Sequence, residues 1–346
     1  MKLKFGIIGA GNIAPVHATA IQNIKDVELV AVAANHLERA QALTSQFGGV
    51  AYRDYKELLS QSDVDIVTLC VPHFLHAPLT LEAAAAGKHV ICEKPMAISL
   101  AECDTMIAAC NKAHVNLGII FQGRFEPLAI KLKKAIDSGE LGRLLWVSAN
   151  VFWHRTDAYY DSAPWRGTWA SEGGGVLINQ AIHALDLLLW LTGTPTRVIG
   201  RIQTLNHQIE VEDCAMAMLE YANGQMGIIQ ATTVAIPGFP ERIEIYGSEG
   251  SAIYHKGQGQ LEWHFNDASR NHVDKVEASS GAAQPMDITA AAHTAQFKDF
   301  VEAVLEHRAP SVDGKAGRSS IELIEAIYRS SRKNIPIDIP FQEDEA

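Results

Sequence analysis

One apolar stretch near the middle of the chain contains three polar residues, spaced by four and then three positions: Asn179, His183 and Asp186. In an α-helix this spacing places an amide, an imidazole and a carboxylate on one face. Of these groups the imidazole is the one that titrates near neutral pH, and buried polar groups are unfavourable unless they have partners. The three residues are therefore a candidate site for proton transfer.

The helix that should carry these residues is marked at both ends. Gly173, Gly174 and Gly175 precede it, apolar residues continue it over 187–191, and Gly193 is placed to end it. A polar row directly behind a glycine-rich turn favours a binding site over a plain core helix. Asp186 is the member of the row that we expect to be structural.

Length and composition limit the class of protein. The 346 residues predict two domains. The balance of 29 basic and 40 acidic residues gives a net charge of −11 and argues against nucleic acid as a partner.

We expect no membrane partner, because no apolar run reaches membrane-spanning length, and the first strand leaves no room for a signal peptide. The five cysteines lack metal-ligand spacing, so we expect no metal site and reduced, buried thiols in a cytoplasmic protein.

The N-terminal end has the pattern of a turn that binds dinucleotide phosphates. A strand over 4–8 is followed by Gly9, Gly11, Asn12 and Ile13, and a helix then runs over 13–24. The glycines allow a tight turn and let backbone N–H groups approach a pyrophosphate at the helix N-terminus. A plain tight turn is the alternative, but the position at the first strand of an alternating chain favours a cofactor site.

The next strand, 27–33, should end in an Asp or Glu that binds the ribose of NAD. Instead, Asn35, His36 and Arg39 follow it. These residues are suited to a 2′-phosphate, which favours NADP slightly, with NAD still open. Alternatively, they form only the solvated start of a helix.

Strands and helices then alternate through residue 121, which predicts a doubly wound parallel sheet of the Rossmann type. Ligands bind outside the carboxyl ends of strands in such sheets. Several of the polar residues there could be surface loop residues. Lys94 is the strongest candidate, because it directly precedes a proline at a strand end. The residues at these strand ends are Pro72, His73, His76, Glu93, Lys94, Gln122 and Arg124.

Beyond Arg124 the pattern changes, so we divide the chain into a dinucleotide-binding domain, 1–122, and a second domain, 123–346. Strands in the second domain follow one another without helices between them, which predicts a largely antiparallel sheet with helices in an α+β arrangement. We expect a loop over 266–285, helices over 289–308 and 319–331, and a loop over 311–318. The predicted strands are 144–152, 197–204, 214–221, 224–234, 241–247, 251–255 and 261–264.

These motifs together resemble the glucose–fructose oxidoreductase / inositol dehydrogenase family of sugar and cyclitol dehydrogenases. The most specific pair is Glu93-Lys94-Pro95 with the glycine run that leads to His183. The resemblance extends over the whole chain and implies hydride transfer between a nicotinamide ring and a ring hydroxyl. It also implies an open-faced sheet that makes a homodimer or homotetramer.

The resemblance identifies Lys94 and His183 with the family's catalytic lysine and histidine. Asn179 stands where the family commonly has Asp, so it can orient a hydroxyl but cannot be a charged partner. On this basis His183 is the expected acid–base group and Lys94 stabilises alkoxide charge. Two other functions remain open: a glycoside hydrolase that uses NAD without net redox change, and a dinucleotide-binding regulator.

We expect Tyr160, Trp165 and Arg166 to line the substrate pocket with Asn179 and His183. An aromatic face beside an arginine suits a sugar ring that carries a carboxylate or phosphate. Tyr160 and Trp165 could equally be core aromatics. The sequence does not identify the particular sugar or cyclitol.

Overall fold

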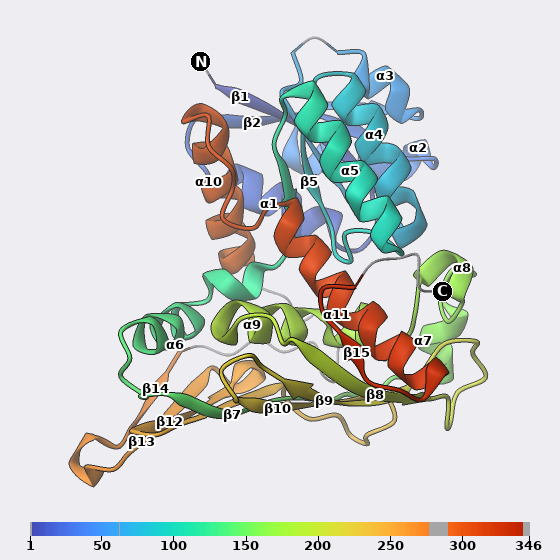
Figure 1. The fold of residues 1–346 in the computed structure, drawn as a ribbon. Coiled ribbons are helices and arrows are strands. Elements are labelled where there is room, and N and C mark those ends of the chain that lie inside the picture. Colours follow the sequence, from blue (N-terminus) through green and yellow to red (C-terminus); the bar gives the residue numbers. More distant parts are fainter. Residues whose placement is uncertain (1, 62, 277–289, 342–346) are drawn as a thin grey trace. The chain divides into compact units, whose positions relative to one another are not determined.

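The computed structural model describes residues 2–61, 63–276 and 290–341. The chain divides into two compact units, drawn together in Figure 1. Unit 1 comprises residues 1–125 and 289–318, and unit 2 comprises residues 126–288 and 319–346. The sequence-based division at residue 122 had placed 289–318 in the second domain. The helix of this segment instead packs on the first helix of unit 1, and its Phe297 and Phe300 enter the core around Phe5.

Within the described residues, unit 1 holds a six-stranded parallel sheet in the order β3-β2-β1-β4-β5-β6. This order is that of a doubly wound Rossmann fold and confirms the predicted fold class. The strands are β1 (Leu3–Ile8), β2 (Val27–Ala33), β3 (Val50–Tyr52), β4 (Ile66–Leu69), β5 (His89–Cys92) and β6 (Leu117–Ile119). The helices are α1 (Ala14–Gln22), α2 (Leu37–Phe47), α3 (Tyr55–Leu59), η1 (His73–Leu75), α4 (His76–Ala85), α5 (Leu100–Ala113), η2 (Gln122–Phe125) and α10 (Ala290–Leu305).

Local side chains explain where several helices of unit 1 begin. The Asp54 side chain accepts the N–H of Lys56 at the start of α3. Ser99 Oγ accepts the N–H of Glu102 at the start of α5, and the Glu102 carboxylate accepts the N–H of Ile98. Such reciprocal caps satisfy N–H groups that the first turn of a helix leaves without intrahelical partners.

The sheet of unit 2 has nine strands among the described residues, in the order β14-β13-β12-β11-β7-β10-β9-β8-β15. Neighbouring strands are antiparallel except for β7 and β10, which are parallel, so the prediction of a largely antiparallel sheet is confirmed. The strands are β7 (Leu144–Phe152), β8 (Arg197–Gln203), β9 (Cys214–Glu220), β10 (Met226–Thr232), β11 (Arg242–Gly247), β12 (Gly250–His255), β13 (Gln260–Phe265), β14 (His272–Lys275) and β15 (Ile337–Asp338).

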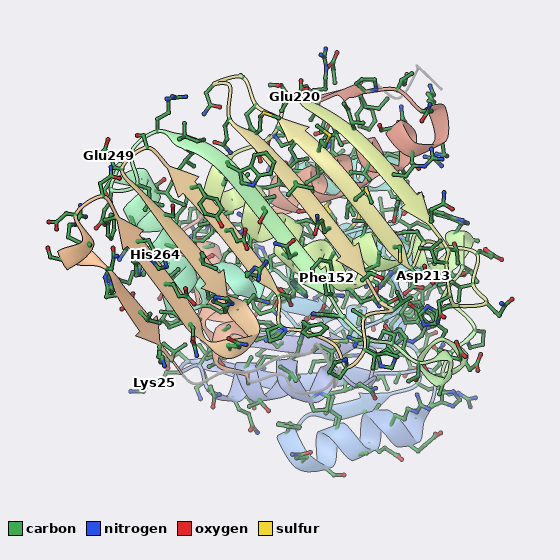
Figure 2. The ribbon with its side chains drawn as sticks, turned by 90° about the horizontal axis from the view of Figure 1, so that it is seen from below. Lys25, Phe152, Asp213, Glu220, Glu249 and His264 are labelled. Carbon is green, nitrogen blue, oxygen red and sulfur yellow. The ribbon has the colours of Figure 1, made fainter. Side chains whose placement is uncertain are left out.

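Helices of unit 2 lie along one face of this sheet, and Figure 2 shows the other face with its side chains in view. These helical elements are α6 (Pro127–Asp137), α7 (Asp157–Asp161), α8 (Trp169–Glu172), the π-helix η3 (Val176–Ala181), α9 (Ile182–Thr192) and α11 (Gly314–Lys333). Short 3₁₀ turns are η4 (Lys256–Gln258) and η5 (Ala268–Arg270).

Three segments differ from the sequence-based expectation. Strand β14 falls inside the segment expected to be a loop, where it pairs with β13. The part of that segment beyond residue 276 lies outside the described residues. Helix α11 begins at Gly314 rather than at residue 319, and Asp313 Oδ1 accepts the N–H of Ala316 in its first turn. Strand β15 was not expected, since two residues carry too little pattern to reveal a strand.

The helical stretch Trp169–Thr192 is long and apolar enough, by length and composition, to cross a membrane, which corrects the statement that no run reaches that length. It is a core element, because 89% of its most apolar window is buried, and its helix α9 packs on β7, β11 and α6. All five cysteines of the described chain are free thiols, four of them buried.

Candidate active site

The turn between β1 and α1 is tight at its first glycine and exposed at its second. Gly9 has a φ of +98°, and a Cβ there would lie 2.2 Å from the carbonyl oxygen of Cys70, so only glycine fits. Gly11 is exposed, and a Cβ on it would make only an ordinary contact, 3.9 Å from the same oxygen. The second glycine is therefore not needed for packing, and it leaves the N-terminal end of α1 open to a ligand.

The other predicted cofactor residues all lie at the carboxyl ends of the parallel strands. Because these strands run in one direction, their ends share one edge of the unit 1 sheet. Asn12 and Ile13 follow β1, and Gln122 follows β6. Asn35, His36 and Arg39 are exposed after β2, whereas His73 and His76 are buried after β4 and Pro72 is partly exposed. Glu93 and Lys94 follow β5.

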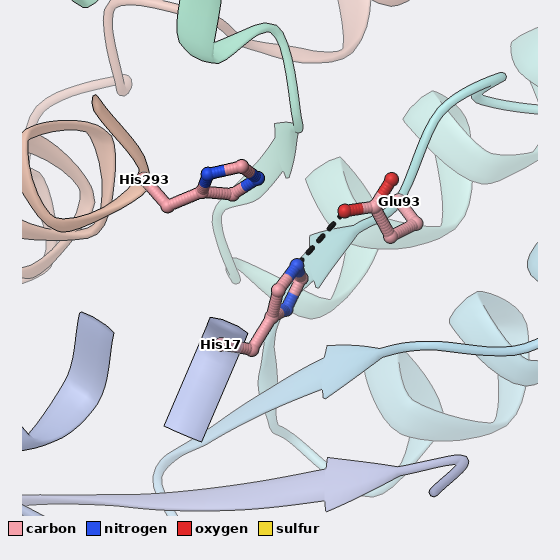
Figure 3. A group of neighbouring side chains, drawn as sticks. All are labelled: His17, Glu93 and His293. Atoms are coloured by element: carbon pink, nitrogen blue, oxygen red, sulfur yellow. Dashed lines mark hydrogen bonds and ion pairs between the residues drawn. The ribbon is translucent and has the colours of Figure 1, made fainter. Parts of the chain in front are cut away.

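Glu93 is held by a buried ion pair that the sequence did not reveal. His17, on α1, lies with Nε2 2.8 Å from Glu93 Oε1 (Figure 3). Its Nδ1 lies 2.8 Å from Thr68 Oγ1. Burial lowers the pKa of His17, but the neighbouring Cys70 thiol and the Glu93 carboxylate raise it to about 10 overall. Burial raises the pKa of Glu93, and the His17 imidazolium lowers it to about 2 overall. The pair is therefore ionised across the neutral range.

Glu93 of this ion pair also holds the backbone N–H of Lys94. Glu93 Oε2 accepts the N–H of Lys94 at 3.1 Å, so both carboxylate oxygens of Glu93 are engaged. His76 Nδ1 lies 2.6 Å from the Pro95 carbonyl oxygen, and its Nε2 lies 3.0 Å from that of Val71. Burial lowers the pKa of His76. His76 thus ties the segment after β5 to the end of β4.

His293, on α10, lies near this pair, and the ligand atoms of His17, Glu93 and His293 fall within 4.8 Å of one another (Figure 3). Two imidazoles and a carboxylate are a donor set that zinc accepts. However, both ring nitrogens of His17 already have partners in Glu93 and Thr68. We therefore interpret the cluster as a hydrogen-bonded network that links α1, β4 and β5.

In unit 2, the glycine run is held by one acidic residue that lies far along the chain. The buried Glu212 carboxylate accepts the N–H groups of Gly175 at 2.8 Å and Leu177 at 2.9 Å, and its backbone oxygen accepts that of Val176. Tyr328 donates its hydroxyl to the same carboxylate. Burial, opposed by these hydrogen bonds, raises the pKa of Glu212 to about 7.

The helix after the glycines is not one continuous α-helix, which corrects the expected geometry. Residues Val176–Ala181 form a π-helix, and α9 begins only at Ile182. Asn179 therefore lies in the π-helix, while His183 and Asp186 lie in α9, so the α-helical spacing does not relate Asn179 to the other two. Short π-helices occur frequently at functional sites. Ser320 donates to Asp186, as expected of a structural residue.

Asn179 is oriented by a buried carboxylate that precedes the glycines. Its Nδ2 donates to Glu172 Oε1 and, at 3.2 Å, to the Tyr159 hydroxyl. The other Glu172 oxygen accepts the N–H of Gly167. Because a carboxylate only accepts hydrogen bonds, it forces the amide nitrogen toward itself. Glu172 and Tyr159 thus accept the two hydrogens of Nδ2 and fix the orientation of the amide.

Tyr159 is the centre of the polar cluster, although the sequence pointed to its neighbour Tyr160. Arg166, Asn179 and Gln180 all donate hydrogen bonds to the Tyr159 hydroxyl. Tyr160 is buried, and its hydroxyl is hydrogen-bonded to Thr233 Oγ1 at 3.0 Å. Trp165 lies under the Arg166 guanidinium, with its ring centroid 4.6 Å from Cζ.

The residues that sequence reasoning missed share one property. Each reaches the site through a contact that spacing along the chain does not reveal, since none belongs to a local motif. Glu172 had a weak signal, as an acid directly before the glycines, and Arg155 follows three residues after the long predicted strand 144–152. The missed residues are His17, Arg155, Tyr159, Glu172, Gln180 and Glu212.

The chain matches known proteins over nearly its whole length. Residues 3–121 match the oxidoreductase family with the NAD-binding Rossmann fold, and residues 129–253 match the GFO/IDH/MocA C-terminal domain. The solved WlbA dehydrogenase from Bordetella pertussis, in complex with NADH and UDP-GlcNAcA, is 32% identical, with a TM-score of 0.85 and coverage of 99% of this chain and 100% of that one.

Two enzymes are similar over about three quarters of the chain. The myo-inositol 2-dehydrogenase of Thermotoga maritima is 30% identical, over 72% of this chain and 74% of its own length. The glucose-6-phosphate 3-dehydrogenase of Bacillus subtilis is 31% identical, over 73% of this chain and 75% of its own length. With both of its units matched in this way, the chain belongs to the GFO/IDH/MocA family of NAD-binding sugar and cyclitol dehydrogenases.

Proposed function

We propose that the protein transfers a hydride between a nicotinamide cofactor and a ring hydroxyl of a sugar, sugar acid, sugar nucleotide or cyclitol, with His183 as the acid–base group and Lys94 as its assistant. The observation that carries the proposal is the fixed backbone of Lys94 at the carboxyl edge of a Rossmann sheet, where such sheets bind ligands. The relatives named above act on, or are bound to, a cyclitol, a sugar phosphate and a sugar nucleotide.

The reaction needs one group that takes the hydroxyl proton and one that stabilises negative charge on oxygen. In the oxidation direction, His183 takes the proton of the hydroxyl, for which its ordinary pKa is suited. Lys94 stabilises the negative charge that develops on the same oxygen. Asn179 orients the substrate through its amide. When bound, the nicotinamide accepts the hydride that leaves the carbon.

For the cofactor, Gly9, Gly11, Asn12 and Ile13 would hold the pyrophosphate at the start of α1. NAD is the cofactor of the family fold, and the Bordetella structure contains NADH. The exposed Asn35, His36 and Arg39 make NADP the second cofactor to test.

A substrate screen tests this function. We expect the full-length protein with NAD⁺ or NADP⁺ to produce reduced nicotinamide with at least one member of a panel of polyols, aldoses, sugar acids, sugar phosphates and sugar nucleotides. Release of an alcohol from an aryl glycoside without net change in nicotinamide absorbance would instead indicate a hydrolase. Cofactor binding without turnover of any panel member would indicate a regulator.

We also propose that a second copy of the chain covers the face of the unit 2 sheet that Figure 2 shows. Ile199, Met218 and Ile228 are neighbours in register on β8, β9 and β10, and Met226 pairs with Trp146. Such a contiguous apolar surface on a folded domain is typical of an interface.

The solution mass measured by light scattering tests this second proposal. We expect a dimer or tetramer at micromolar concentration, and Met218→Lys should lower the mass because it places a charge in the apolar surface. Leu305→Lys, a change of an exposed apolar residue on α10, is the control that should leave the mass unchanged. A wild-type monomer would contradict the proposal.

A further inference from the structure

Five residues of unit 2 form an alternating series of aromatic rings and guanidinium groups, which we call the arginine–aromatic stack. Its members, in order, are Trp153, Arg155, Tyr159, Arg166 and Trp165. The Arg155 Cζ lies 4.8 Å from the Trp153 ring centroid and 5.3 Å from that of Tyr159. The Arg166 Cζ lies 4.1 Å from the Tyr159 centroid and 4.6 Å from that of Trp165.

The stack brings two guanidinium groups together, of which Arg155 is buried and Arg166 is partly exposed. Arg155 is only 5% exposed. Burial lowers the pKa of Arg155, Tyr159 and Tyr160 raise it, and the charge of Arg166 lowers it again, so the two guanidinium groups are close enough to repel each other. Two like charges held near one tyrosine are unfavourable unless an anion offsets them.

The nearby acid does not supply that anion to Arg166. Glu172 is engaged with Asn179 and with the N–H of Gly167. Across the part of the chain that the structure describes, Arg166 forms no ion pair with a carboxylate, and its Nη1 donates a hydrogen bond to the Tyr159 hydroxyl.

Polar atoms around the stack also lack protein partners. Arg166 Nε and Trp153 Nε1 are buried N–H groups for which the described residues offer no hydrogen-bond acceptor. Trp153 is 8% exposed, and Gln180, whose Nε2 donates to Tyr159, is 3% exposed. Buried donors without acceptors are uncommon in folded proteins because they are costly, so these N–H groups indicate a site for a ligand that accepts hydrogen bonds.

We propose that the arginine–aromatic stack binds an oxyanion of the substrate, the carboxylate or phosphate of an acidic sugar derivative. The rings cover the faces of the guanidinium groups, so the N–H groups at their edges remain directed in the plane. Those edges match the two oxygens of a carboxylate or phosphate, and the stacking fixes them before the ligand arrives. The inference rests on the proposed function, since it names the class of sugar on which the enzyme acts.

Paired ligands test the proposal by calorimetry on the full-length protein with NADH present. UDP-GlcNAcA against UDP-GlcNAc, and glucuronate against glucose, differ in the sugar carboxylate. Glucose 6-phosphate against glucose tests phosphate as the source of the oxyanion. We expect the acidic member of at least one pair to bind at least tenfold more tightly than its neutral partner.

Substitutions test which residues cause the preference for the acidic ligand. Arg166→Gln should remove most of the preference for the acidic ligand, and Arg166→Lys should restore only part of it, because lysine keeps the charge but not the planar fork. Arg155→Gln should act in the same direction. Arg201→Gln, a change of an exposed arginine on β8, is the matched control and should keep the full preference.

Equal binding of the acidic and neutral members of every pair, or an undiminished preference in a folded Arg166→Gln variant, would overturn the proposal and leave the stack a structural element. These results are separable from the proposed function. Preferential binding of an acidic ligand without any turnover would contradict the dehydrogenase and keep the stack as an oxyanion site. Turnover of neutral sugars without any preference for acidic ligands would support the dehydrogenase and contradict the oxyanion site.

Discussion

Replacing His183 by Ala lowers kcat for oxidation of a ring hydroxyl by about 10²–10⁴-fold, the usual contribution of a positioned acid–base group. Lys94→Ala should produce a loss of similar size, because the alkoxide that develops at the hydroxyl oxygen then has no positive charge to stabilise it. Both losses should appear under single-turnover conditions with saturating cofactor, which separates the chemical step from cofactor binding.

Matched variants distinguish this effect from general damage. His264→Ala removes an exposed histidine from β13, and Lys112→Ala removes an exposed lysine from α5, so both should keep wild-type kcat. The affinity for NADH should change little in His183→Ala, since His183 is not part of the Rossmann unit. Wild-type turnover in the His183 or Lys94 variant would exclude that residue from the mechanism.

Gly175→Ala should destabilise unit 2 by about 3 kcal/mol, at the upper end of the usual range for overpacking. A Cβ at this position would lie 1.8 Å from the backbone oxygen of Glu212, a distance that no side-chain adjustment can relieve. The clash would also separate Glu212 from the N–H groups of Gly175 and Leu177.

The melting temperature followed by circular dichroism measures this effect, with Gly139→Ala as the control. Gly139 has a φ of +74° at the end of α6, and no atom lies within 4 Å of the Cβ position, so its substitution brings backbone strain without a clash. The left-handed region costs about 1–2 kcal/mol for a residue with a Cβ. A Gly175→Ala variant as stable as Gly139→Ala would contradict the close approach.

The parts of the fold that could be predicted from the sequence depend on local patterns. The tight turn at Gly9 and the alternation of strands and helices each depend on residues that are neighbours in the chain. Their geometry follows from the φ that glycine allows and from periodicity, so no knowledge of distant contacts is needed.

What could not be predicted depends on contacts between distant segments. Glu212 caps a turn that lies 37 residues before it, and His17 pairs with an acid 76 residues after it. The π-helix was hidden for the same reason, since Leu, Ile and Ala are compatible with an α-helix, and the capping carboxylate that holds its start lies elsewhere. The sequence therefore identified the polar residues of this stretch, but neither the π-helix that separates Asn179 from His183 nor the partners that orient Asn179.

The two units alternate along the chain, so that each is assembled from two separate stretches. No single cut can release either one intact: a chain that ended at residue 288 would lack α10 of the Rossmann unit and most of α11 with β15 of the sheet unit. The C-terminal stretch from residue 289 is thus divided between both units, so neither unit can be obtained complete as one continuous fragment of the chain.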